Sequence, residues 1–423
     1  MDFPDILHIP EGINFECSGC GNCCLIWPVP ASDSDYERIV ALVGQGDVGN
    51  QPVARHFRKM QSASAADKLS HFSYTLEKQA DGRCAFLTED DRCRLHTEFG
   101  AEAKPGMCQL FPYTFTDAPD GYYASVSFAS TAVLFNAGRA LSDQEDFLRT
   151  RLALFKRLFP QLSLDWSKIE LYDGSPLRWP QYLAIEEKLR RHFRPLAPGA
   201  GGQEKSGQPQ AQISRLLLSA SRDLLAILPG HVDLERTALV ETTPEKVDWL
   251  LIRHLHDFYF PEDVLAARDH SFGAHALMQQ LVRPPDCQPV FIGEHQFSWP
   301  QICQGPLPAM PPDCEELLAR FVYARLFSKL YFGPGLAHLS VIAGFHHLGL
   351  LLALLRIKLK LLYRQRCGDS PETRNWPFAF SEFAELLRAL ERRLTSARYS
   401  REASSILQVL LESPARFERI MNI

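Results

Sequence analysis

Four cysteines stand within eight positions near the start of the chain, in the stretch FECSGCGNCC. They are Cys17, Cys20, Cys23 and Cys24, and their spacing is CxxCxxCC. Thiols this close together form disulfides, bind a metal ion or metal cluster, or act as a reactive redox centre. The small and turn-forming residues between them allow the backbone to wrap around a common point. The spacing alone therefore leaves three kinds of chemistry open.

Three more cysteines, Cys84, Cys93 and Cys108, complete a group of seven within the first 108 residues. The chain begins MDFPDILHIPEGINFE, which has acidic residues where a secretory signal would be basic, and has no long apolar run. We therefore expect a cytoplasmic protein, in which disulfides do not persist. Metal binding becomes the leading interpretation of the cluster, and a freely reactive thiol stays a minor alternative, with Cys24 as its candidate.

The ligand set is expected to draw on all seven of these cysteines. CxxCxxC also begins the bacterial ferredoxin motif, in which a further cysteine lies elsewhere. Adjacent Cys23 and Cys24 are expected to point in different directions, so that Cys84, Cys93 and Cys108 are the natural completing ligands. Seven thiolates exceed the needs of one tetrahedral zinc and suit one iron–sulfur cluster with spare thiols, or two sites. The spacing does not choose between zinc, copper(I) and iron–sulfur.

Composition limits the classes of partner. The chain has 423 residues, of which 46% are hydrophobic and 22% charged, an ordinary globular balance for two or three domains. A formal net charge of -5 gives no support to nucleic acid or an anionic membrane surface as a partner. The stretch from Leu336 to Leu355 has no Asp, Glu, Lys or Arg and is long enough to span a bilayer, but its three histidines favour a buried helix. We expect no membrane or nucleic acid partner, and the oligomeric state stays open.

The elements that must position the cysteines differ along the chain. A short helix is predicted from Ser32 to Val43, and hairpins are predicted around the turns TEDDR, between Cys84–Leu87 and Cys93–Leu95, and DAPDG, within Pro112–Phe128. From Gln144 onward apolar residues recur at helical spacing. The predicted fold is mainly α with a small irregular α+β cysteine-rich metal-binding module at the N-terminus.

The predicted domains follow from these changes in pattern. Residues 1–130 are the cysteine-cluster module, 131–194 a helical extension, 195–212 a linker rich in Pro, Gly and Gln, and 213–423 an α-helical domain. Cys287, Cys303, Cys314 and Cys367 are scattered through the second half and are interpreted as buried or incidental thiols. No phosphate loop, GxSxG elbow or HExxH helix is present.

The histidines are expected to have structural roles. His254 and His256 are two residues apart, and such side chains do not face each other on a helix. The adjacent His346 and His347 also diverge and lie in an apolar stretch. Neither pair is predicted to bind a metal.

The ordered motifs CSGCGNCC, GRCAFL, CRLH and KPGMCQLFPY, over roughly residues 13–128, resemble the YkgJ-type cysteine-cluster family, which is described as zinc- or iron-chelating. Position by position, this resemblance implies that the metal ligands are Cys17, Cys20, Cys23, Cys24, Cys84, Cys93 and Cys108. It implies an iron–sulfur cluster, of which 4Fe-4S is the expected type, or zinc as the cofactor.

A longer branch of that family, the flagellin lysine-N-methylases, is similar in length, in its helical second half and in the segment LLARFVYARLFSKLYF. This second resemblance implies a protein lysine N-methyltransferase that uses S-adenosylmethionine and a protein substrate. Ala129 stands where that branch has another cysteine, and Ser400 lies in a segment without its Glu-His pair. Cofactor binding rests on the resemblance alone, because the chain lacks both a glycine-rich turn after a first strand and the radical-type CxxxCxxC motif. The alternative function is a non-catalytic interaction module stapled by zinc.

Overall fold

The computed structural model describes residues 6–25, 28–44, 47–48, 51–60, 72–160, 162–194, 212–228, 245–261, 271–272, 290–292, 295–367 and 375–423, and side chains at most of these positions. The chain forms two compact units, Met1–Ser163 and Leu164–Ile423. The predicted linker, residues 195–212, lies outside the described residues except for Gln212. The predicted divisions at residues 130 and 194 stay predictions. The fold class is confirmed: helices dominate, and small sheets accompany the cysteines of the N-terminal region.

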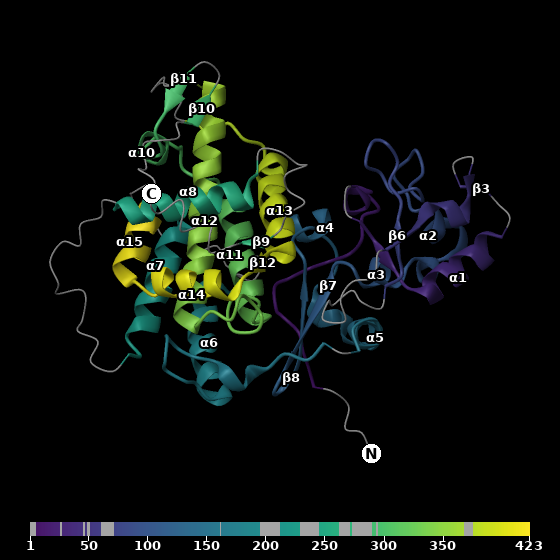
Figure 1. The fold of residues 1–423 in the computed structure, drawn as a ribbon, viewed down its shortest axis with the longest axis horizontal. Helices are drawn as coiled ribbons and strands as arrows, with labels where there is room; N and C mark the ends of the chain where they lie inside the picture. The colour runs from purple at the N-terminus through teal and green to yellow at the C-terminus, as the bar shows by residue number, and fades with distance from the viewer. Residues whose placement is uncertain are drawn as a thin grey trace. The chain divides into compact units, whose positions relative to one another are not determined.

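Two small three-stranded sheets organise the first unit (Figure 1). One has the order β1 (Leu7–His8), β8 (Gly121–Val126), β7 (Tyr113–Ala118), and the other has the order β2 (Pro30–Ala31), β6 (Tyr74–Leu76), β5 (Phe57–Lys59). Strands β7 and β8 pair antiparallel with Tyr113 opposite Val126, which confirms the hairpin predicted around DAPDG. Short β3 (Asp47–Val48) and β4 (Gln51–Pro52) pair with each other.

Short helices carry or support most of the cysteines of this unit. They are η1 (Asn22–Cys24), α1 (Asp33–Val43), η2 (Val53–His56), α2 (Arg94–Phe99), η3 (Ala101–Ala103), α3 (Gly106–Leu110), α4 (Thr131–Leu134), η4 (Leu141–Gln144) and α5 (Glu145–Leu158). The predicted helix over Ser32–Val43 is confirmed as α1. Its capping box is complete, because Ser32 Oγ accepts from the Asp35 amide at 3.2 Å and Asp35 Oδ2 accepts from the Ser32 amide at 3.3 Å.

The second unit is a bundle of helices with a few two-residue and three-residue strands. Its elements are η5 (Trp166–Lys168), α6 (Trp179–Phe193), α7 (Gln212–Leu225), α8 (Lys246–Tyr259), β9 (Ser271–Phe272), β10 (Val290–Ile292), β11 (His295–Phe297), α10 (Trp299–Cys303), α11 (Pro312–Phe327), α12 (Val341–Cys367), α13 (Phe380–Ser396), β12 (Arg398–Tyr399), α14 (Arg401–Leu411) and α15 (Pro414–Met421). The long helices α7, α8, α11 and α13 lie in the region, residues 213–423, for which the apolar spacing predicted an α-helical domain.

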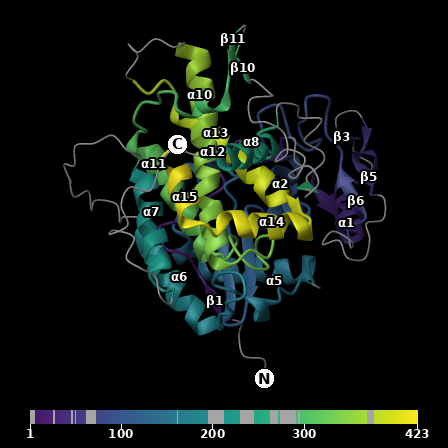
Figure 2. The ribbon, with the colours of Figure 1, turned by 60° about the vertical axis from the view of Figure 1, so that its left-hand side comes forward.

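Helix α12 is the centre of this bundle and contacts α7, α8, α10, α13, α14 and α15 (Figures 1 and 2). Within the described part of the chain it is long and apolar enough to cross a membrane, yet 89% of its most apolar 18-residue window is buried in the protein. The stretch flagged as a span candidate therefore forms a buried helix, the interpretation that its histidines favoured. The expectation of no membrane partner stays a prediction.

An ion pair between α6 and the residues that follow α11 is fully buried in the second unit. The Nζ of Lys329, which is 0% exposed, donates to Glu186 Oε1 at 3.0 Å, and Glu186 is 1% exposed. Tyr182 Oη also donates to Glu186, at 2.6 Å. Burial of two charges is costly unless both are paired and hydrogen-bonded, so each partner depends on the other. This pair ties the start of the connection to α12 onto α6.

The buried pair yields a stability prediction with a neighbouring control. Glu186→Gln leaves the Lys329 ammonium buried without a counter-charge and should destabilise the protein by roughly 3–5 kcal/mol. The adjacent Glu187 pairs with Arg190 and Arg191 at the surface, so Glu187→Gln should cost less than about 1 kcal/mol. Urea unfolding of both variants measures the difference. Equal midpoints would contradict the role assigned to Glu186.

Candidate metal centre

The structure places five of the seven predicted cysteine ligands on four separate segments of the first unit. Cys23 and Cys24 lie in η1, Cys84 precedes a turn, Cys93 immediately precedes α2, and Cys108 lies in α3. Cys84 belongs to the hydrophobic core of this region, and Cys24, Cys93 and Cys108 pack against that core. Folding thus brings together residues that are far apart in the sequence, since Cys24 and Cys108 pack against the same hydrophobic cluster.

Backbone hydrogen bonds fix Cys24 beside Cys84. The amide of Cys84 donates to the Cys24 carbonyl at 3.1 Å, and the Nζ of Lys78 donates to the same oxygen at 2.8 Å. Leu25 and Arg83 form an antiparallel bridge next to them. The motif alone did not identify Lys78, because its contact is with a carbonyl 54 residues away and gives no pattern in the sequence.

Cys93 is positioned by a turn and the start of a helix. Leu87 pairs with Cys93 across the TEDDR turn, and the Thr88 amide donates to the Arg92 carbonyl at 2.8 Å. The prediction of a second strand over Cys93–Leu95 is wrong, because Cys93 is the N-cap of α2 and helix begins at Arg94. The two cysteines do flank the turn as predicted, so the error affects the element and not their proximity.

Cys108 is held by the packing of α3. The amide of Gly106 donates to Asp35 Oδ1 at 3.1 Å, and the same oxygen pairs with Arg38 at 2.7 Å. Arg38 also donates to the carbonyls of Ala103 and Lys104, at 2.7 and 2.9 Å. Asp35 therefore caps its own helix and orients the segment that carries Cys108, a role that the capping pattern by itself did not reveal.

The thiols of these five cysteines share one electrostatic environment. A hydrogen bond with Cys23 and burial raise the pKa of Cys24 far above its ordinary value, and negative charge on Cys23, Cys108 or Cys84 would raise it further. Burial raises the pKa of Cys108 and of Cys84, and in each case charge on Cys93 and Cys23 adds to the effect. Negative charge on one thiol of this group would therefore disfavour negative charge on its neighbours. A bound cation is the natural counter-charge.

Cys23 and Cys24 are neighbours in η1, a 3₁₀ helix that follows Gly21, whose φ of +66° is left-handed. The expectation that the two side chains point in different directions stays a prediction. A Cβ at Gly21 would lie 3.0 Å from Asp91 Cβ, so η1 packs directly against the turn between Cys84 and Cys93.

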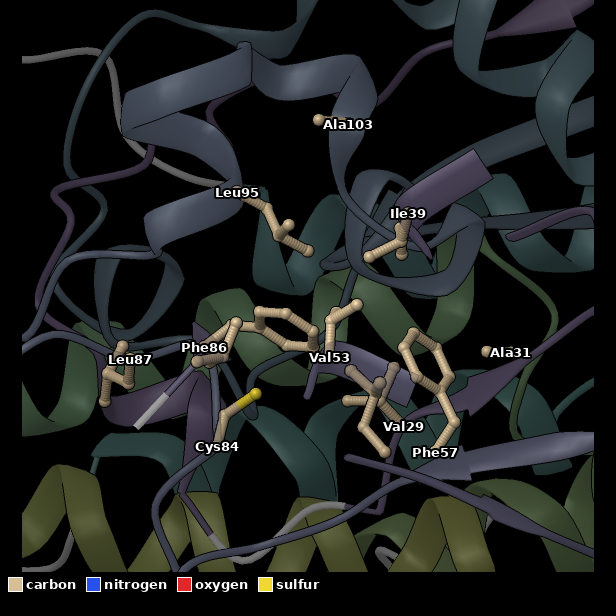
Figure 3. Packing of buried hydrophobic residues seen from close by; sticks show 12 residues of the cluster. Val29, Ala31, Ile39, Val53, Phe57, Cys84, Phe86, Leu87, Leu95 and Ala103 are labelled. Atoms are coloured by element: carbon tan, nitrogen blue, oxygen red, sulfur yellow. The ribbon is translucent and has the colours of Figure 1, made fainter. Parts of the chain in front are cut away.

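The donor set fits a thiophilic metal, although the side chains as they stand do not form a finished coordination shell. In the portion of the chain that the structure describes, no group of three or more His, Cys, Asp or Glu side chains is arranged to hold a metal ion. The available donors are thiols that pack against a hydrophobic cluster, in which the Cys84 side chain lies beside Phe86 and Leu87 (Figure 3). Thiolates in such surroundings suit zinc or iron–sulfur and not calcium or magnesium.

Cys17 and Cys20 differ from the other five because both are exposed. They follow a segment that is fixed by hydrogen bonds from the amides of Phe15 and Glu16 to the carbonyls of Arg139 and Ala137, both at 3.0 Å. Charge on Cys17 contributes to raising the pKa of Tyr113 to about 12, after the larger effect of burial, so this thiol lies near the β7 strand. Their participation in the ligand set stays a prediction.

The cysteines of the second half of the chain that the structure describes are buried or partly buried. Cys303 and Cys314 are buried, and burial raises the pKa of each to about 12. Cys367 is partly buried, and Cys287 lies outside the described residues.

The two adjacent histidines of α12 have hydrogen-bonding partners in the core. His346 lies 2.7 Å from Ser221 Oγ and 2.6 Å from the Leu411 carbonyl, and His347 lies 3.0 Å from Tyr259 Oη. Burial lowers the pKa of His346 to about 4 and of His347 to about 3. Both histidines are core residues, as expected.

Comparisons with known proteins agree with the chemistry of this cluster. No curated protein and no solved structure matches the chain. Residues 16–129, which include all seven N-terminal cysteines, match the model of the CxxCxxCC family, described as a "Putative zinc- or iron-chelating domain". The similarity to this family therefore covers the region that contains the seven N-terminal cysteines.

Proposed function

We propose that the first unit binds zinc or an iron–sulfur cluster through cysteine thiolates. The observation that carries the proposal is the convergence of Cys24, Cys84, Cys93 and Cys108, from four segments, on one hydrophobic cluster, with Cys23 next to Cys24 in η1. Cys17 and Cys20 complete the ligand set by their position in the CxxCxxCC motif. A buried group of thiols has no evident use as neutral side chains at these spacings, whereas deprotonated thiols are strong metal ligands.

Metal binding would also stabilise this unit. Its sheets have strands of two to six residues, and the cysteine-bearing segments are joined mainly by turns. A small irregular region of this kind gains folding free energy when one ion cross-links several segments. The protein supplies the orientation: Lys78 and Asp35 fix the backbone at Cys24 and at α3, and the hydrophobic side chains exclude water from Cys84.

Metal identity separates the two forms of the proposal. If the protein is purified without oxygen, a brown colour with visible absorption and equal amounts of iron and sulfide identifies an iron–sulfur protein. A colourless protein that contains only zinc identifies the zinc-stapled interaction module instead. Metal and sulfide analysis of the full chain measures both. A protein that takes up neither metal, as purified or after reconstitution, would overturn the proposed function.

A pair of buried cysteines gives a matched test of the ligand set. Cys84 and Cys303 are 7% and 1% exposed, so replacement by serine buries a hydroxyl group to a similar extent at each position. Cys84→Ser should weaken metal affinity at least about 100-fold, because loss of an outer-shell partner alone costs about 10- to 100-fold. Cys303→Ser should keep the metal content of the unsubstituted protein. Metal titration, with circular dichroism to establish that both variants fold, measures this. Equal metal loss in both would show that Cys84 is not a ligand.

Lysine N-methylation of a protein, with S-adenosylmethionine as methyl donor, is the enzymatic form of this proposal. The methylase proposal rests on the resemblance of the helical second unit to the methylase branch. We also propose a cytoplasmic location, because the start of the sequence is acidic and has no long apolar run. If the methylase proposal is correct, S-adenosylmethionine should raise the melting temperature of the metal-loaded protein in a concentration-dependent way. S-adenosylhomocysteine serves as the comparison ligand. No shift and no heat of binding with either compound would exclude the methylase form.

A further inference from the structure

Lys78 is a charged residue outside the cysteine motif, and its side chain reaches the backbone of a predicted ligand. Its Nζ donates to the Cys24 carbonyl at 2.8 Å, and the Cys84 amide donates to the same oxygen at 3.1 Å. Lys78 also pairs with Cys84 in an antiparallel bridge. The ammonium group of Lys78 is therefore held where two segments that carry cysteines meet.

We propose that Lys78 is the charge-compensating residue of the metal centre, a group that binds no metal itself but offsets negative charge on the thiolates of Cys24 and Cys84. This inference rests on the proposed function and concerns a residue outside the ligand set. A protonated lysine has no lone pair to offer a metal, so Lys78 acts only through its charge and its hydrogen bond. Its ammonium stabilises the thiolate form of its neighbours, which is the form that binds a metal.

The electrostatics at Cys84 support this role. Burial is the largest effect on the Cys84 thiol and raises its pKa, whereas a hydrogen bond with the Phe86 backbone and the positive charge of Lys78 act in the opposite direction. Because Cys84 is buried, water can do little to stabilise a negative charge on its sulfur. Lys78 thus reduces the cost of the charge that metal ligation requires.

Neighbouring residues hold Lys78 in position. On one side, Gln79 Nε2 donates to the Cys84 carbonyl at 3.2 Å. On the other side, the Glu77 amide donates to the His56 carbonyl at 2.7 Å. The ammonium group therefore does not have to be ordered when a metal binds, and a charge that is already in place costs little conformational entropy.

Lys104 has a similar electrostatic effect at another cysteine. Burial raises the pKa of Cys108, and neighbouring cysteines raise it further, whereas the positive charge of Lys104 lowers it. Lys78 differs from Lys104 because its ammonium also donates to the backbone of a predicted ligand. Charge compensation is therefore assigned to Lys78, for which the hydrogen bond and the electrostatics agree.

A positive group beside the ligands matters because a site made of thiolates carries excess negative charge. A Zn²⁺ ion in a shell of thiolates has more ligand charge than ion charge, and net charge is one of the factors that set the reduction potential of an iron–sulfur cluster. Loss of the Lys78 charge should therefore weaken metal binding. In an iron–sulfur form it should also move the reduction potential to lower values, because reduction adds a further negative charge.

Substitutions that separate charge from hydrogen bonding test this role. Lys78→Met removes both, Lys78→Gln keeps a donor without the charge, and Lys78→Arg keeps the charge. The control Lys59→Met removes the charge of an exposed lysine in β5. Competition with a chromophoric chelator for Zn²⁺ measures the affinity of each full-length variant. Lys78→Met and Lys78→Gln should bind zinc at least about tenfold more weakly, whereas Lys78→Arg and Lys59→Met should stay close to the unsubstituted protein.

Urea unfolding with and without zinc separates charge compensation from a merely structural role. Lys78→Met should lower the unfolding midpoint more in the zinc-loaded protein than in the metal-free protein, because the charge is needed when thiolates are present. An equal loss in both states would make Lys78 a structural residue. If the protein binds an iron–sulfur cluster and no zinc, the reduction potential replaces zinc affinity: Lys78→Met should lower it, and Lys78→Arg should restore it.

The outcomes distinguish this inference from the proposed function. Unchanged metal affinity and reduction potential in Lys78→Met would overturn the inference. Full affinity in Lys78→Gln would overturn it as well, because the effect would then belong to the hydrogen bond on Cys24. Failure of the unsubstituted protein to bind zinc or an iron–sulfur cluster would instead count against the proposed function. If Lys78→Met folds poorly, as judged by circular dichroism, Lys78→Gln decides the comparison.

Discussion

The crowding of cysteine thiols against a hydrophobic core is the constraint on which the cysteine region of the first unit depends. Burial and neighbouring sulfurs both disfavour negative charge on Cys24, Cys84 and Cys108. Metal ligation requires the opposite, because the ligand is the thiolate. Without a cation the site is consistent with neutral thiols, and with one it can hold several thiolates. The same groups thus have two charge states, and the presence of a metal decides between them.

The backbone around these cysteines is held by short local motifs and not by one long helix or sheet. A capping box, a tight 3₁₀ turn and a bridged loop each place one or two cysteines, and backbone hydrogen bonds such as that from Cys84 to Cys24 join them. Strands of two or three residues contribute little cooperative stability of their own. Backbone hydrogen bonds therefore fix the segments that carry the cysteines.

Local patterns in the sequence predicted much of the fold. The helix that begins after Ser32, the hairpin around DAPDG and the helices of the second unit were recognisable because capping residues, turn residues and apolar spacing act within a few positions. The strand expected over Cys93–Leu95 failed because Cys93 caps a six-residue helix too short for a clear period. The hydrogen bond of Lys78 and the second role of Asp35 were not predictable, because they depend on partners 54 and 71 residues away. The spacing of the cysteines indicated their chemistry, but only the fold distinguishes the exposed Cys17 and Cys20 from five cysteines that are partly or fully buried.

Helix α3, which carries Cys108, connects the proposed centre to another part of the first unit. Its first residue is Gly106, and a Cβ there would lie 2.9 Å from Leu158 Cδ2, at the end of α5. Helix α3 therefore packs closely against the last turn of α5, five residues before the boundary of the first unit at Ser163. By thermodynamic linkage, any preference of the metal for one orientation of α3 is equally a preference for one docking of α5. Metal binding at the thiols would then also affect the packing of α5, at the C-terminal end of this unit.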